Sequence, residues 1–201
     1  MRQRRWGPPK SEMALRRYLE RLENGTDTPR DQVPWPWTVV AQETARRAYA
    51  ILQNFVQRTR KWKSNPGLVW AMGIAEELLG REPWTMYPEG VEKFEQLNTK
   101  YAAKAQAAWN KELPPAEAQA AAEALHQIWL VYSPKEPWGE TEIVEAVSYW
   151  LCATNPKSCR NPMYDMRSVK WSEPPYVNLV KDWWLSVWNE LKAIDPNVTL
   201  V

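Results

Sequence analysis

The chain has little glycine, and this scarcity excludes several common kinds of site. It has 7 glycines in 201 residues, and the glycine-rich motifs of phosphate-binding loops, dinucleotide-binding folds and hydrolase nucleophile turns are absent. Proline is plentiful, at 17 residues. Few glycines and many prolines suit helices separated by rigid turns better than a sheet of hairpins, because tight hairpin turns favour glycine.

Cysteine and histidine are also scarce. The chain has two cysteines, Cys152 and Cys159, and one histidine, His126. These three residues cannot make an ordinary zinc site without carboxylates, and two cysteines are not a disulfide framework. We therefore expect reduced, structural thiols, no metal and no cofactor. A cysteine nucleophile paired with His126, or a two-carboxylate hydrolase, is left open, but nothing selects either, so we do not expect an enzyme.

Long apolar segments are missing as well. No apolar run reaches the roughly 18 residues that suggest a membrane span. The basic start of the chain lacks the apolar region of a signal peptide, and Arg2 at the second position excludes N-myristoylation there. Together with the expected reduced thiols, these features predict an intracellular protein, cytoplasmic or nuclear.

The stretch from residue 38 to residue 63 has the clearest helical pattern. Its apolar residues recur at i, i+3, i+4 and i+7, which places them on one side of a helix. The other side is cationic, and Glu43 is the only acid in the stretch. Thr38 is placed to cap this helix, and Asn65-Pro66 to end it. The apolar side predicts a core helix, while the cationic side is either solvated or bound to phosphate on nucleic acid or a lipid surface.

The same kind of pattern recurs along the chain, so we predict an all-α fold, a bundle of about seven helices joined by proline-rich corners. The predicted helices cover residues 11–23, 38–63, 66–79, 89–113, 116–131, 141–153 and 176–194. We expect residues 1–37 to form a basic arm, a short helix and a Pro/Trp linker, and residues 38–153 a helical core. Residues 154–201 would form an irregular connector and a Trp-rich helix packed on that core.

The charge is unevenly distributed along the chain. Residues 1–63 carry 14 Lys and Arg against 6 Asp and Glu, and residues 64–201 carry 12 against 18. A basic end and an acidic body indicate either an anionic partner or packing of one end on the other within the fold. The candidate residues for anion or nucleic-acid binding are Arg2, Arg4, Arg5, Arg46, Arg47, Arg58, Arg60 and Lys61.

Tryptophan is unusually abundant, with 14 residues. Those on predicted helices are expected to fill the core. The tryptophans in predicted loops or beside prolines are the candidates for binding a partner, because Trp is enriched at interface hot spots: Trp35, Trp37, Trp84, Trp138 and Trp171. A latch folded over the bundle and stacking on unpaired bases are the alternatives for such rings.

Two short strings resemble lentiviral sequences. Ser133 to Pro137, and Asn155-Pro156 followed by Cys159, resemble fragments of a retroviral capsid region, and the cationic helical N-terminal part is similar in style to a Gag matrix domain. The resemblance covers a small part of the chain, and we transfer no residue role from it. It implies a viral helical structural or accessory protein.

These features predict a non-enzymatic, helical protein-interaction module, an adaptor or assembly protein, whose basic N-terminal third steers it to an acidic partner. The alternative is a nucleic-acid-binding protein that uses the same basic third. A second alternative is an enzyme whose cleft the sequence does not reveal. Peripheral binding to an acidic membrane and oligomer formation are further partner classes that the charge pattern allows.

Overall fold

The structure is a computed structural model, and it describes residues 35–80, 89–131, 140–157, 174–194 and 196. At 35–37, 89–95, 97–98, 101, 131 and 140–141 only the backbone is described. The predicted helix 11–23 lies outside these ranges, as do Arg2, Arg4, Arg5, Trp84, Trp138 and Trp171.

Within the described residues the fold is an all-α bundle, as predicted, and it contains no strand. Six α-helices and one short 3-10 helix follow one another: α2 (Trp35–Arg58), η1 (Arg60–Trp62), α3 (Pro66–Leu79), α4 (Glu89–Lys111), α5 (Ala116–Val131), α6 (Glu140–Thr154) and α7 (Pro174–Ile194). The apolar periodicity located each of these six helices to within a few residues. None of them is long and apolar enough to cross a membrane.

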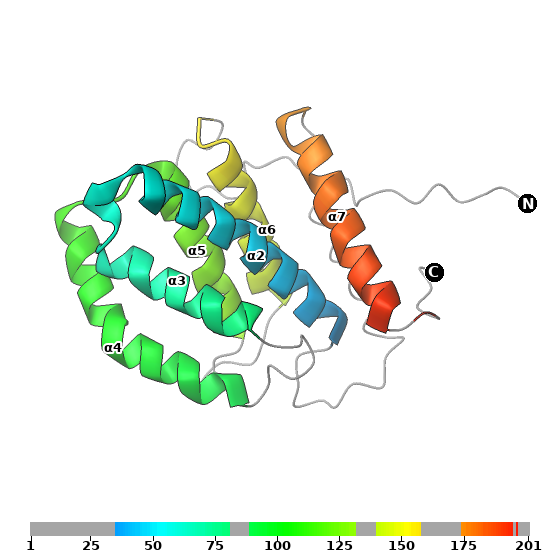
Figure 1. The fold of residues 1–201 in the computed structure, drawn as a ribbon, viewed down its shortest axis with the longest axis horizontal. Coiled ribbons are helices and arrows are strands. Elements are labelled where there is room, and N and C mark those ends of the chain that lie inside the picture. The colour runs from blue at the N-terminus through cyan, green and yellow to red at the C-terminus, as the bar shows by residue number, and fades with distance from the viewer. Residues whose placement is uncertain (1–34, 81–88, 132–139, 158–173, 195, 197–201) are drawn as a thin grey trace, which may run out of the picture.

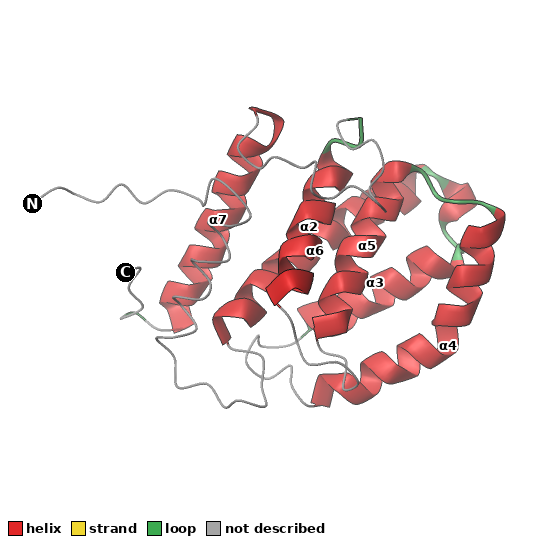
Figure 2. Cartoon of the chain, turned by 180° about the vertical axis from the view of Figure 1, so that it is seen from behind, coloured by secondary structure: helices red, strands yellow, loops and turns green. Residues whose placement is uncertain are grey.

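Helix α2 is the central element of the bundle. It packs against α3, α5, α6 and α7, while α4 lies on α3 (Figure 1). Seen from both sides, α4 and α7 occupy opposite ends of the molecule (Figure 2). Every residue from Thr38 to Ala45 is buried, including the polar residue Gln42. The Gln42 side chain donates to the backbone carbonyl of Leu78 on α3, at 3.2 Å.

Both predicted ends of this helix are wrong. The helix begins at Trp35, so Thr38 is an interior residue and Trp35-Pro36-Trp37 is a first helical turn, where proline is well tolerated. It stops at Arg58, because Thr59 has a non-helical backbone conformation (φ −126°, ψ 86°) and its hydroxyl bonds back to the carbonyl of Phe55. Such side-chain bonds to the backbone compete with helix propagation. The chain then continues as η1.

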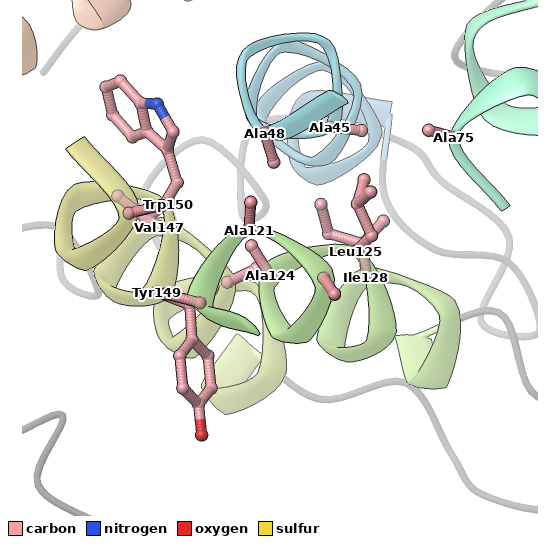
Figure 3. Packing of buried hydrophobic residues seen from close by; sticks show 14 of the residues in the cluster. Ala45, Ala48, Ala75, Ala121, Ala124, Leu125, Ile128, Val147, Tyr149 and Trp150 are labelled. Atoms are coloured by element: carbon pink, nitrogen blue, oxygen red, sulfur yellow. The ribbon is translucent and has the colours of Figure 1, made fainter. Parts of the chain in front are cut away.

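Small side chains bring α2, α3 and α5 close together. Ala45 and Ala48 of α2 face Ala121 of α5 and Ala75 of α3 in the interior (Figure 3). The alanines of α5 therefore permit the close approach that their size predicts. Larger buried residues, among them Leu52, Leu68, Ile74 and Leu78, fill the space around this contact.

Helices α3 and α4 pack closely against each other at a glycine, Gly67. Asn65 caps α3, because its side-chain oxygen accepts bonds from the backbone N–H groups of Gly67 (3.0 Å) and Leu68 (3.3 Å). The same oxygen accepts from the indole N–H of Trp109 on α4, at 3.2 Å. The Trp109 ring lies directly over Gly67, so a Cβ atom at that position would overlap it.

Helix α7 lies at one end of the bundle and packs on α2 (Figure 1). Its buried face contains Tyr176, Val180, Trp183, Trp184, Val187 and Leu191. Leu185 is exposed, as the helical pattern indicates.

The expectation of reduced thiols is wrong. Cys152 is fully buried in the last turn of α6 and is disulfide-bonded. The sequence has one other cysteine, Cys159, which lies outside the described residues. The spacing in the sequence could not distinguish a single disulfide from two separate thiols, and we chose the wrong alternative.

We predict that Gly67→Ala destabilises the protein by about 2 kcal/mol, because the added methyl group displaces Trp109 and breaks its bond to Asn65. Gly80→Ala is the control, since a Cβ atom there makes only an ordinary contact with the backbone oxygen of Glu76. Chemical denaturation followed by circular dichroism measures both variants. Equal stability of the two variants would contradict the close contact at Gly67.

Candidate functional site

The largest group of charged residues in the described structure is centred on Glu43. This side chain is only 4% exposed on α2, and its two oxygens pair with Arg46 and with Arg47, the latter at 2.8 Å. A buried carboxylate is costly unless it is paired and hydrogen-bonded. The i, i+3 and i, i+4 spacing of the two arginines supplies this pairing within one helix.

Both arginines that pair with Glu43 also bond residues of α7. Arg47 forms an ion pair with Asp182 at 2.8 Å, donates to the Ser186 hydroxyl at 3.2 Å and lies 5.5 Å from the centre of the Trp150 ring. Arg46 pairs with Glu190 at 2.9 Å. Burial opposes the charge on Arg46, but its bonds to Glu190 and Glu43 outweigh burial and raise its pKa.

A hydrogen bond between uncharged groups adds to this connection. The indole N–H of Trp183 on α7 donates to the hydroxyl of Thr44 on α2, at 3.2 Å, and that hydroxyl donates to the Val40 carbonyl, at 2.8 Å. We call the set Glu43, Thr44, Arg46, Arg47, Asp182, Trp183, Ser186 and Glu190 the α2–α7 polar network. Sequence reasoning missed its acidic members, although the spacing of Glu43 to Arg46 and Arg47 was a usable signal.

Arg46 and Arg47 are therefore bonded to acidic residues inside the fold. We had grouped them with Arg58, Arg60 and Lys61 as one anion-binding face. The structure separates the two groups, because Arg46 and Arg47 face α7 while the others lie where α2 ends.

The second group of cations we call the basic corner: Arg58, Arg60, Lys61 and Lys63, all exposed. It lies where η1 approaches the connection between α4 and α5, at the upper left of Figure 1. Arg58 pairs with Glu117 at 2.9 Å, and Lys61 pairs with Glu112. Neither Arg60 nor Lys63 has an ion pair with any residue that the structure describes. Exposed ion pairs are weak, so the corner keeps an excess of positive charge.

Six of the eight helical tryptophans that we expected in the core are buried, namely Trp62, Trp70, Trp129, Trp150, Trp183 and Trp184. Trp109 and Trp188 are partly buried against the same core. Trp35 and Trp37 lie in the first turn of α2, where only the backbone is described. The partner-binding role predicted for the loop tryptophans thus stays a prediction.

His126 is packed between two tryptophans on α3 and α5. Its ring centre lies 5.0 Å from that of Trp70 and 5.8 Å from that of Trp129, and its Nδ1 is 3.4 Å from a Glu123 oxygen. Cys152 is disulfide-bonded and therefore cannot act as a thiolate nucleophile beside it. Among the described residues, no group of three or more His, Cys, Asp or Glu is arranged to hold a metal ion.

We predict that Glu43→Gln destabilises the protein by about 3 kcal/mol, because it leaves two arginines without their buried counter-charge. The matched control is Glu117→Gln, which removes the partner of the exposed Arg58 and should cost less than about 1 kcal/mol. Urea denaturation of both variants tests this difference. Equal losses would show that burial of Glu43 has no energetic consequence.

Comparison with protein-family models, with curated proteins and with solved structures finds no match to this chain.

Proposed function

We propose that this protein is a non-enzymatic helical interaction module, an adaptor or assembly protein, that binds an acidic segment of a partner protein through the basic corner. The observation that carries the proposal is the position of Arg60 and Lys63. Both are exposed at one corner of the bundle, and neither is paired with a described acidic residue. Unpaired cations on a surface attract an oppositely charged partner and guide its orientation.

A protein partner suits this corner better than nucleic acid. Proteins that bind single strands combine a cationic groove with exposed aromatic rings on which bases stack. The aromatic residue at this corner, Trp62, is 8% exposed, and the Lys61 ammonium group lies 4.9 Å from its ring centre. It therefore offers no free face for a base. Nucleic-acid binding is the competing proposal, and the experiment below separates the two.

The geometry also disfavours a membrane surface as the partner. A helix that lies in a membrane interface exposes a continuous apolar face beside its cations. The apolar residues of α2 near the corner, Leu52 and Phe55, are buried in the core. The viral origin implied by the sequence resemblance stays a prediction.

The intracellular location predicted from sequence has lost part of its support. It relied on reduced thiols, whereas Cys152 is disulfide-bonded, and disulfides persist mainly in oxidising compartments. We propose that the protein acts in a compartment where the disulfide bond of Cys152 is maintained. Mass spectrometry of the purified protein, alkylated without reductant after denaturation, should detect no modified cysteine. Alkylation of both cysteines would contradict this proposal.

The double variant Arg60→Glu/Lys63→Glu should weaken binding of a fluorescent poly-glutamate peptide by at least about tenfold at low salt, because it reverses the charge of the corner. The control Lys157→Glu/Lys181→Glu changes the net charge by the same amount. Lys157 is exposed after the end of α6, and Lys181 is exposed on α7. Fluorescence anisotropy measures both.

Two results would count against the proposal. Equal weakening by the two double variants would mean that binding follows net charge and not the corner. Tighter binding of a single-stranded RNA than of poly-glutamate, lost in Arg60→Glu/Lys63→Glu, would favour the nucleic-acid alternative.

A further inference from the structure

The connection between α4 and α5 places an exposed apolar surface beside the basic corner. It consists of residues 112–115, which we call the α4–α5 link. Leu113 of this link is 55% exposed, and among the described residues the one other exposed large hydrophobic residue is Leu185 on α7. Pro115 and Ala116 are exposed as well. The link thus presents a short apolar surface and not an isolated side chain.

Two ion pairs connect this apolar surface to the basic corner. Glu112, the residue before Leu113, pairs with Lys61. Glu117, in the first turn of α5, pairs with Arg58 at 2.9 Å. The apolar residues of the link therefore lie between two points at which the chain contacts cations of the corner, at the upper left of Figure 1.

The α4–α5 link is rigid before any partner binds. Pro114 and Pro115 each have a fixed φ angle. The Pro115 carbonyl also accepts the backbone N–H groups of Ala118 (2.9 Å) and Gln119 (3.0 Å) at the start of α5. A surface that is already ordered loses little conformational entropy on binding. Single exposed apolar residues are ordinary, but an apolar surface on a rigid link beside several cations matches the apolar centre and polar rim of an interface.

We propose that the acidic segment bound by the basic corner carries an aliphatic or aromatic side chain between its carboxylates, and that this side chain packs on Leu113 and Pro115. The carboxylates of the segment bond Arg60 and Lys63, which have no ion pair with a described residue. They also compete for Lys61, because its exposed ion pair is weak. This selectivity rests on the proposed function of the basic corner, to which it adds a preference among acidic segments.

The test uses the full chain and two fluorescent peptides of equal length and charge: an oligo-glutamate with one central leucine, and the same peptide with serine in that place. The leucine peptide should bind about fivefold more tightly, because part of its apolar surface leaves water on Leu113. Leu113→Ser should remove this preference and leave binding of the serine peptide unchanged. Arg60→Glu/Lys63→Glu should weaken binding of both peptides alike. Fluorescence anisotropy measures each affinity.

The matched control is Leu185→Ser, which should change neither affinity. Leu185 is 56% exposed, almost the same as Leu113, and it lies on α7 at the other end of the molecule from the basic corner (Figure 1). Circular dichroism shows whether each variant is folded. The comparison of the two peptides on the native chain does not depend on any variant.

The outcomes separate the apolar contact from the charge of the corner. Equal binding of the two peptides, or an equal loss of preference in Leu185→Ser and Leu113→Ser, overturns the apolar contact and leaves the proposed function standing. If neither peptide binds, both proposals fail. Self-association of the native chain that Leu113→Ser abolishes, measured by analytical ultracentrifugation, would place a second copy on the link and would also overturn the apolar contact with an acidic segment.

Discussion

The pairing of one buried carboxylate with two arginines connects the last helix to the centre of the bundle. Glu43 lies inside the bundle on α2, where an unpaired charge would be costly, and Arg46 and Arg47 neutralise it. Because the arginines have donors to spare, they also bond Asp182, Ser186 and Glu190, and so they join α7 to the central helix. The buried aromatic and aliphatic side chains of α7 then complete the contact.

The charge asymmetry of the sequence has two different physical outcomes. Part of the basic N-terminal third pairs with acidic residues of the C-terminal helix, which is the internal packing that the charge count allowed. The remainder, at Arg58, Arg60, Lys61 and Lys63, stays on the surface. Net charge over a segment cannot distinguish these outcomes, because they depend on which residues face another helix and not on composition.

Apolar periodicity was enough to predict the all-α class and six helices, because each helix must bury one side and the spacing of its apolar residues records that side. The failures occurred where other forces decide. The chain leaves the α-helix at Thr59 through a local side-chain bond, and the first part of α2 is buried on every side, so polar residues such as Gln42 and Glu43 are interior. Which helices surround α2 is a tertiary property that no local pattern records. The α2–α7 polar network was missed for the same reason, since it combines residues from two helices.

Amide hydrogen exchange of α7 tests most directly whether the α2–α7 polar network holds this helix against α2. The comparison is between the native protein and Glu43→Gln, with the amides of α5 as the internal reference. If the α2–α7 polar network holds α7 in place, Glu43→Gln should reduce the protection of the α7 amides much more than that of the α5 amides. Protection of α7 that is unchanged in Glu43→Gln would contradict the account, because α7 would then be held by its apolar face alone.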